Sequence, residues 1–364
     1  MRTTVLILSS FIVFGFVSLK YGSFSATDKS NDILHSRRQL QSSWVERHPD
    51  RAISDWARNN FQPLSTSPGG GEKEVYLFWH LPKSGGSTAK NIYKCLGLSL
   101  ASRLKPSIGK YEENDIIAFE PFGRHSGTYV NVDVTTHEGM LRAEELGLVP
   151  SGKADIIFAM EVSFAGDHLF DAQHKGRMLG LFRHPIQRLV SKFYYLQTAT
   201  WEKTYRPEWK GMDIYTWATT QNKENNIMVK QLSGLKFRDT ATEVDLRRAM
   251  RTIEKRFVVG LTDEMKESIR RFNIIMNIDL TPLRNQNCMR RYFGHVKGSL
   301  KTNSHPHPNL EPGSPAWDAL AEANSLDIQL YDHIIRVFYD QKAVIDSYST
   351  SVNELNNLEV NWGV

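Results

Sequence analysis

A five-residue apolar run at residues 75–79, Val-Tyr-Leu-Phe-Trp, leads into a loop rich in Gly and Ser and then into a helical pattern. The run has the length and composition of a buried strand. After the loop, apolar residues recur with helical spacing at Ala89, Ile92, Tyr93, Leu96 and Leu100. A strand that passes through a short loop into a helix is the repeating unit of α/β domains, so this segment favours that class.

The same alternation continues along the chain. Further strands are expected at residues 156–160, 178–182 and 257–261. Pro185 stands at the start of one helical pattern, and residues 242–245, Thr-Glu-Val-Asp, form a capping box at the start of another. A long helix is expected over residues 314–339. We therefore predict one α/β domain, a P-loop-like three-layer structure with a mostly parallel central sheet flanked by helices.

Composition and charge exclude several classes of protein. Of the 364 residues, 40% are hydrophobic and 23% are charged, unlike a disordered chain or a polytopic membrane protein. The 45 Lys and Arg outnumber the 40 Asp and Glu, and ten of these cations lie in two windows without acidic residues, 172–201 and 280–310. Such windows are either solvated basic faces or parts of a pocket for a polyanion, and we favour the pocket. A nucleic acid is not expected, because the nearby aromatic residues are not spaced like a stacking platform.

The first 73 residues differ from the rest of the chain. Residues 3–19 carry no charge, so residues 4–19 are expected to be a transmembrane signal anchor, with a signal peptide as the alternative. Residues 1–3 are then a cytosolic tail. Residues 20–73 are expected to be a stem, residues 74–346 the folded domain, and residues 347–364 a polar tail. This order places the folded domain in the lumen of the secretory pathway.

The two cysteines, Cys95 and Cys288, exclude a disulfide-rich scaffold and a four-cysteine zinc site. They can form one disulfide in an oxidising compartment. Cys95 falls on the helix expected just behind the loop, which favours the unpaired state. The sequence alone leaves the pairing open.

The loop at residues 80–88 reads His-Leu-Pro-Lys-Ser-Gly-Gly-Ser-Thr and opens into a helix. Backbone N–H groups of such a loop converge in front of a helix N-terminus, where they bind a phosphate or a sulfate. Lys83 adds a positive charge, and the hydroxyl groups add further donors. In the Walker motif of nucleotide triphosphatases the Lys follows the glycines. Here Lys83 precedes Gly85 and Gly86, so the loop is not a Walker loop.

This loop resembles the 5′-phosphosulfate loop of sulfotransferases that use 3′-phosphoadenosine 5′-phosphosulfate (PAPS). It is most similar to the Golgi carbohydrate group that includes heparan sulfate 2-O-sulfotransferase. A second motif strengthens the resemblance, because Arg183, Pro185 and Ser191 match the spacing of that family's 3′-phosphate motif. Independently of the family, Arg183 is expected at the carboxyl end of a strand, where α/β sheets bind ligands.

The resemblance implies an enzyme that transfers a sulfuryl group from PAPS to a hydroxyl, with a glycan as the favoured acceptor and no metal. The donor-binding residues that it implies are Lys83, Ser84, Gly85, Gly86, Ser87, Thr88, Arg183, Ser191, Lys301 and Thr302. Lys301 and Thr302 fall where related enzymes place a loop that closes over the donor. The implied location is the Golgi membrane, single-pass type II with a luminal catalytic domain, or secretion after signal cleavage. The oligomeric state stays open.

Lys83 and Glu161 are the expected catalytic residues. Lys83 would stabilise the charge that develops on the leaving phosphate. Heparan sulfate 2-O-sulfotransferases carry a His just after the strand that follows the cofactor loop, and Glu161 takes that place in this sequence. A carboxylate at a strand end can accept the proton of an acceptor hydroxyl. His137 and His168 are the alternative bases.

Two other functions are consistent with the same loop. A kinase or nucleotidase would need a carboxylate that holds a metal ion, and would act on ATP. A non-catalytic protein that binds anionic glycans would keep the fold without the chemistry. The effect of a 3′-phosphate on nucleotide affinity separates these two functions from a sulfotransferase.

Overall fold

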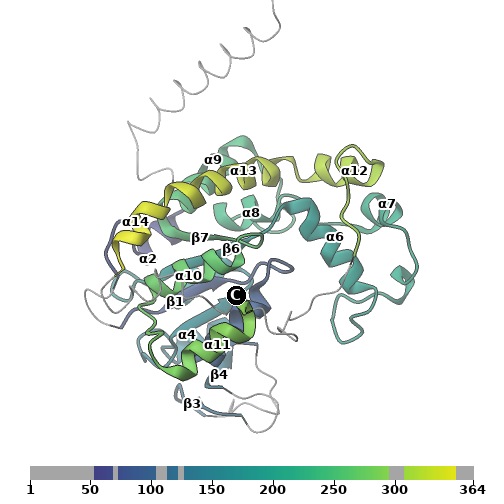
Figure 1. Cartoon of the computed structure of the whole chain (residues 1–364). Coiled ribbons are helices and arrows are strands. Elements are labelled where there is room, and N and C mark those ends of the chain that lie inside the picture. The colour runs from purple at the N-terminus through teal and green to yellow at the C-terminus, as the bar shows by residue number, and fades with distance from the viewer. Residues whose placement is uncertain (1–52, 69–72, 104–112, 122–126, 295–306, 350–364) are drawn as a thin grey trace, which may run out of the picture. The chain divides into compact units, whose positions relative to one another are not determined.

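The computed structural model describes residues 53–68, 73–103, 113–121, 127–294 and 307–349, which form an α/β domain around a seven-stranded sheet (Figure 1). The strands are β1 (Tyr76–Trp79), β2 (Leu100–Ser102), β3 (Ala118–Phe119), β4 (Tyr129–Asp133), β5 (Ile156–Ala159), β6 (Arg177–Phe182) and β7 (Phe257–Leu261). They follow the order β3-β4-β2-β5-β1-β6-β7, and every neighbouring pair is parallel except β3 and β4. The predicted α/β class with a mostly parallel sheet is confirmed.

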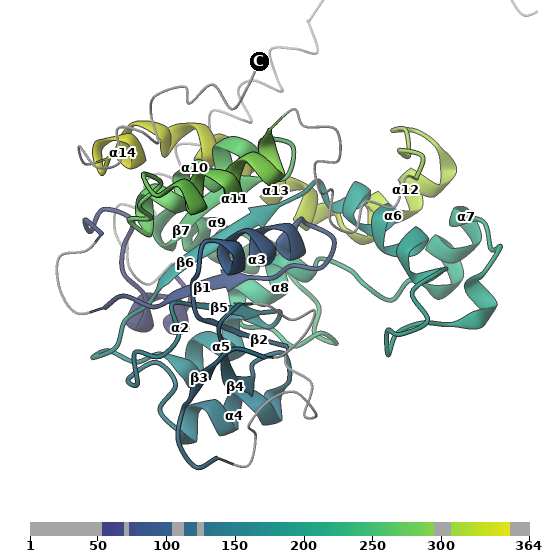
Figure 2. The same cartoon turned by 60° about the horizontal axis from the view of Figure 1, so that its bottom comes forward.

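Helices cover both faces of the sheet (Figures 1 and 2). One face carries α2 (Asp55–Asn60), α4 (His137–Glu145), α5 (Val162–Leu169), α8 (Ile227–Ser233), α9 (Glu243–Arg256) and α13 (Ser325–Asp340). The other carries α3 (Gly86–Cys95), α10 (Met265–Ile275), α11 (Leu283–Phe293) and α14 (Lys342–Ser347). Side chains of a strand alternate between the faces, so Leu77 and Trp79 of β1 join one core and Tyr76 and Phe78 the other. The predicted three-layer arrangement follows from this alternation.

A third hydrophobic cluster lies beside the sheet. It is formed by α6 (Pro185–Leu196), η1 (Pro207–Trp209), α7 (Ile214–Thr216), η2 (Trp217–Gln221) and α12 (Pro315–Ala323). Phe193 and Trp217 pack at its centre with their ring centroids 5.2 Å apart. In both ribbon views α6, α7 and α12 lie together at one side of the domain (Figures 1 and 2).

Most of the expected elements are present. The apolar runs expected to be strands correspond to β1, β5, β6 and β7. Pro185 is the first residue of α6, and the capping box at Thr242 lies at the start of α9. The helix after the loop is shorter than expected, because α3 ends at Cys95 and Gly97 adopts a left-handed φ of 88°. Leu100 therefore lies in β2 and not on the helix.

The single helix expected over residues 314–339 is wrong, because the chain breaks at Asn324 into α12 and α13. The Oδ1 atom of Asn324 accepts a hydrogen bond from the backbone N–H of Asn226 (3.0 Å). In return, Asn226 Oδ1 accepts from the N–H groups of Leu326 and Asp327, at 3.0 and 3.1 Å. This reciprocal pairing satisfies the first amides of α13 and holds α8 against it.

The expected domain start at residue 74 also needs correction. Helix α2 lies in the range expected to be a stem, yet Trp56 and Phe61 are buried in the core. The hydroxyl of Ser54 donates to the carbonyl of Leu232 at 2.5 Å. The folded domain therefore includes residues 53–68, and the chain before residue 74 contributes to its core.

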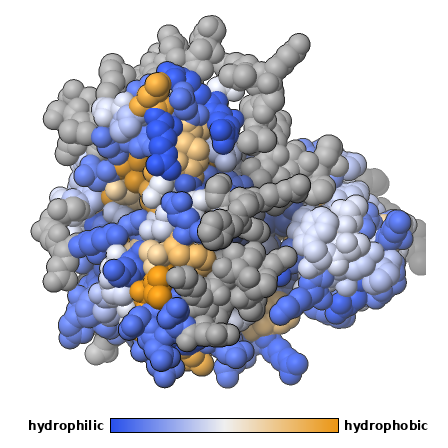
Figure 3. Space-filling model, turned by 90° about the horizontal axis from the view of Figure 1, so that it is seen from below, coloured by the Kyte–Doolittle hydropathy of each residue, from blue (hydrophilic) through white to orange (hydrophobic). Residues whose placement is uncertain are grey.

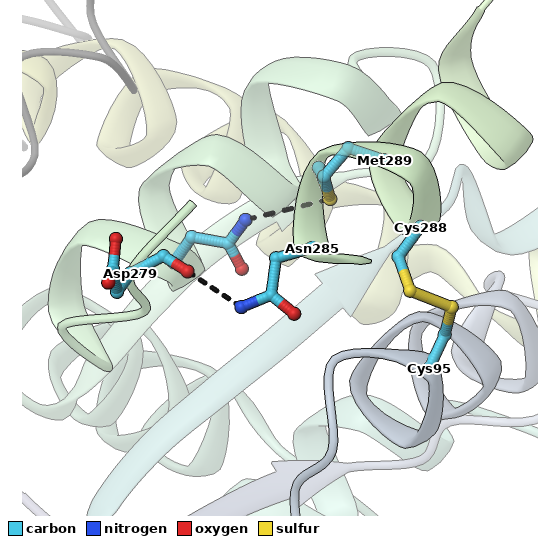
Figure 4. Close-up of a disulfide and its surroundings, with 6 residues drawn as sticks. Cys95, Asp279, Asn285, Cys288 and Met289 are labelled. Atoms are coloured by element: carbon cyan, nitrogen blue, oxygen red, sulfur yellow. Dashed lines mark hydrogen bonds between the residues drawn. A yellow bond between two sulfur atoms is a disulfide. The ribbon is translucent and has the colours of Figure 1, made fainter. Parts of the chain in front are cut away.

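Cys95 and Cys288 form a disulfide that joins α3 to α11 (Figure 4). The favoured interpretation of two unpaired cysteines is therefore wrong. Beside the disulfide, Asn285 Nδ2 donates to the carbonyl of Asp279 at 2.7 Å, which holds the start of α11 (Figure 4). A structural disulfide is typical of proteins that fold outside the cytosol, and it points to an extracytoplasmic domain.

The segment expected to be a signal anchor, residues 4–19, lies outside the described residues. Within the described ranges, no helix is long and apolar enough to cross a membrane. The face of the domain in Figure 3 is mostly hydrophilic, and its hydrophobic residues form small separate areas.

Candidate functional site

The carboxyl ends of four parallel strands bring the candidate residues to one edge of the sheet. The loop at residues 80–85 follows β1, Glu161 follows β5, Arg183 follows β6 and Thr262 follows β7. Hydrogen bonds continue the sheet into this region, because the N–H of His80 donates to the carbonyl of Ala159 at 2.8 Å. Ligands of open α/β sheets bind at this edge, outside the carboxyl ends of the strands.

The loop after β1 has a backbone conformation that only some residues allow. Lys83 and Gly85 have positive φ angles of 68° and 81°. A Cβ at Gly85 would lie 2.6 Å from Met265 Cε, and a Cβ at Gly86 would lie 2.2 Å from the His80 ring. The left-handed φ therefore favours glycine at position 85, and the His80 ring leaves no room for a Cβ at position 86; the turn brings successive backbone N–H groups to the start of α3.

The loop leaves polar groups available to an anion. Within the described residues, the N–H groups of Gly86 and Ser87 have no carbonyl acceptor, as expected at the first turn of a helix. The hydroxyl of Ser84 is buried and has no hydrogen-bond partner in the described residues. A buried hydroxyl without a partner is costly, and an oxygen-rich anion in the loop would satisfy it.

The Lys83 ammonium lies 3.9 Å from the ring centroid of Tyr195, which projects from α6. Burial and the neighbouring Arg183 lower the pKa of Lys83 to about 8, and Glu202 acts in the opposite direction. The ammonium therefore stays mostly protonated at neutral pH but is easier to deprotonate than an exposed lysine. From the sequence, Tyr195 belongs to a group of aromatic residues that either line an acceptor cleft or join the core, and the core is favoured. Its position four residues after Ser191 places it on the same face of a helix.

Arg183 lies directly after β6, and its Nη1 atom is 3.5 Å from the carbonyl oxygen of Lys83. Burial lowers its pKa, and Asp263 opposes this effect. Ser191, two turns along α6, is 8% exposed, which excludes an ordinary exposed hydroxyl at that position. Lys301 and Thr302, the other expected donor contacts, lie outside the described residues.

The three candidate bases lie in one group, which we call the acid–base cluster: Glu161, His137, Phe164, His168 and Glu144. Glu161 Oε2 is 2.6 Å from His137 Nε2, and the His137 ring stacks on Phe164 with centroids 4.0 Å apart. His168 packs on the same Phe164 at 4.1 Å, and its Nδ1 is 2.7 Å from Glu144 Oε2. Two of the three alternative bases, Glu161 and His137, are therefore in direct contact, and His168 shares the Phe164 ring with His137.

Three of the five basic side chains of the first window, residues 172–201, form ion pairs within the domain. Arg177 pairs with Glu74 at 2.9 Å, while Arg188 and Lys192 both pair with Glu224, the latter at 2.6 Å. Burial alone would raise the pKa of Glu224, but these two cations lower it to about 2. For these three basic side chains the expected role in a polyanion pocket is wrong, because each is paired with a carboxylate.

Comparisons with known proteins do not identify a relative. No model of a known protein family matches the chain, and no curated protein matches it.

In the described part of the chain, no group of three or more His, Cys, Asp or Glu side chains is placed to hold a metal ion.

Proposed function

We propose that this domain transfers a sulfuryl group from PAPS to a hydroxyl of a glycan acceptor. The observation that carries the proposal is the loop after β1. It combines N–H groups free to bind an anion, the unpartnered buried hydroxyl of Ser84 and the ammonium of Lys83. Arg183 lies against the same loop, so a second cation is available for a nucleotide that carries two anionic groups.

The residues present fit the two ends of such a donor. The N–H groups of residues 85–87 and the Ser84 hydroxyl would hold the 5′-phosphosulfate, because they converge at the start of α3. Arg183 and Ser191, at the start of α6 and two turns into it, would hold the 3′-phosphate. Lys301 and Thr302 remain predicted contacts. When bound, PAPS supplies the sulfuryl group and the leaving phosphate.

Side chains of the domain then position the reactants and accept the one proton that the reaction releases. The sulfur–oxygen bond to the acceptor forms as the bond to the leaving phosphate breaks, and Lys83 stabilises the charge that develops there. Glu161 accepts the proton of the acceptor hydroxyl. His137, in contact with Glu161, orients the carboxylate and can share the proton. Lys83 and Glu161 follow neighbouring strands, since Trp79 of β1 pairs with Ala159 of β5, and this proximity supports the two proposed roles.

The proposed location is the Golgi membrane, as a single-pass type II protein with a luminal domain, or secretion after signal cleavage. The disulfide between α3 and α11 supports a compartment outside the cytosol.

Calorimetry with adenosine 3′,5′-bisphosphate and AMP tests the proposed donor class. The full-length protein should bind the bisphosphate far more tightly than AMP, because AMP lacks the 3′-phosphate that Arg183 and Ser191 would contact. Lys175→Ala is the matched control, since Lys175 precedes β6 and lies at the opposite edge of the sheet from Arg183. Equal binding of both nucleotides would refute the proposal. Transfer from ATP that a chelator abolishes would instead support a kinase.

A further inference from the structure

The turn after α6 holds a tryptophan that is not buried. Trp201 is 64% exposed, although a Trp side chain normally gains stability from burial. Its Nε1 donates to the Tyr195 hydroxyl at 3.2 Å, and the two rings meet edge to face with centroids 6.2 Å apart. One edge of the indole is therefore fixed while most of its surface faces solvent.

A chain of contacts connects Trp201 to the candidate site. The Tyr195 ring contacts both the Lys83 ammonium and the Trp201 indole. The Tyr195 hydroxyl donates to Glu202 at 2.7 Å. Glu202 Oε2 lies 3.9 Å from Arg103 Nη1, at the end of β2. The position of Trp201 is thus set by residues that also surround Lys83.

Positive charges gather at the same end of β2. We call Lys90, Lys94 and Arg103 the basic cluster. Burial, followed by the charges of Lys94 and Arg103, lowers the pKa of Lys90 to about 8, and Asp133 opposes this. Lys90 Nζ donates to the Ser102 hydroxyl at 2.9 Å, which holds it beside β2. An anion near these side chains would relieve their mutual repulsion.

Strand order separates this region from the expected nucleotide site. Arg183 follows β6, on one side of β1, whereas Glu161 follows β5 and Arg103 follows β2, on the other side. An acceptor hydroxyl that reaches Glu161 therefore lies over β5 and β2. This is the side of the basic cluster.

We propose that Trp201 and the basic cluster form the acceptor subsite and that it binds an acidic oligosaccharide. The apolar face of a pyranose ring stacks on the exposed indole, and a carboxylate or sulfate group of the sugar faces the basic cluster. Tyr195 and Glu202 act as positioning residues, because Tyr195 holds the indole edge and Glu202 lies beside Arg103. This inference rests on the proposed function, which supplies the direction from which the acceptor approaches.

The test is calorimetry on the full-length protein with three octasaccharides: hyaluronan, sulfated maltooctaose and unmodified maltooctaose. Trp201→Ala and Arg103→Ala should each weaken binding of both acidic probes about tenfold, equivalent to about 1.4 kcal/mol. Trp201→Phe keeps an aromatic face and should retain most of the affinity. Tyr215→Ala, which removes a half-exposed aromatic ring from α7, is the control and should bind like wild type. All variants should bind adenosine 3′,5′-bisphosphate with wild-type affinity.

Three results would overturn the subsite: wild-type affinity of Trp201→Ala for the acidic probes, equal binding of neutral and acidic probes, or weaker bisphosphate binding by Trp201→Ala. The third result would mean that the indole stacks on the nucleotide base. Bisphosphate binding is measured separately, so failure of the proposed function is distinguishable. If the acidic probes bind in a way that depends on Trp201 but the bisphosphate does not bind, the sugar subsite is supported and the proposed sulfuryl transfer is refuted.

Discussion

Removing the disulfide between Cys95 and Cys288 should destabilise the domain strongly, because it closes a long stretch of chain. The two cysteines are separated by 193 positions. In the chain-entropy description a cross-link over that separation removes about 18 cal/mol/K from the unfolded state, or about 5 kcal/mol at 25 °C. Domains are stable by about 5–15 kcal/mol, so this loss is a large share of the total.

The perturbation is the double variant Cys95→Ala, Cys288→Ala, unfolded in urea and followed by tryptophan fluorescence. With an m-value of about 3 kcal/mol/M, the midpoint should fall by about 1.7 M. Reducing the wild type should produce a similar fall. The reductant should not affect the double variant, which controls for side effects of the reagent.

The disulfide also has a consequence for the site. It anchors the last residue of α3, and α3 begins at the loop that would bind the phosphosulfate. The double variant should therefore bind adenosine 3′,5′-bisphosphate more weakly at temperatures at which it is still folded. An unchanged urea midpoint, in the variant and in the reduced wild type, would refute the argument that this cross-link stabilises the fold.

The remaining predictions concern the proposed chemistry. Arg183→Ala should weaken bisphosphate binding by ~1.5–3 kcal/mol in calorimetry, because a charge-assisted contact is lost, whereas Lys175→Ala should bind normally. Lys83→Ala should reduce turnover more than bisphosphate affinity, since its contact strengthens as charge develops; unchanged turnover removes it from the mechanism. With the pKa of Lys83 lowered to about 8 by burial and Arg183, the ammonium is present below that pH and lost above it. Bisphosphate affinity should fall as pH rises through 8 in the wild type but not in Lys83→Arg. Glu161→Gln keeps the shape of the side chain and should reduce turnover by roughly 10²–10⁴ with normal nucleotide affinity. If Glu161→Gln stays active and His137→Ala does not, the histidine is the base.

The parts of the fold that could be predicted are those for which local pattern and tertiary environment agree. Strands β1, β5, β6 and β7 are buried on both faces, so each appears in the sequence as a continuous apolar run. The two-residue strand β3 is partly exposed and leaves no such signal. The glycines and the helical periodicity that follows them were enough to predict a loop between β1 and α3.

The parts that could not be predicted depend on contacts between distant segments. The break at Asn324 is caused by Asn226, about a hundred residues earlier, and nothing in the local helical pattern indicates it. The disulfide forms because α11 packs on α3, which a sequence without a known topology cannot show. Similarly, Glu202 reaches Tyr195 only because the chain turns back after α6.

The acid–base cluster changes the question of which residue is the base. Glu161 and His137 are in hydrogen-bond contact, so a proton taken up by one is available to the other, and loss of activity in a single variant does not assign the role. Residues that act as a unit show strongly non-additive losses. If the pair acts as a unit, the double variant Glu161→Gln, His137→Ala should lose hardly more turnover than the more damaged single variant. If Glu161 works alone and His137 is incidental, His137→Ala should leave turnover unchanged and the double variant should match Glu161→Gln. If each contributes independently, the two losses should multiply, and the shared-proton role of His137 would be refuted.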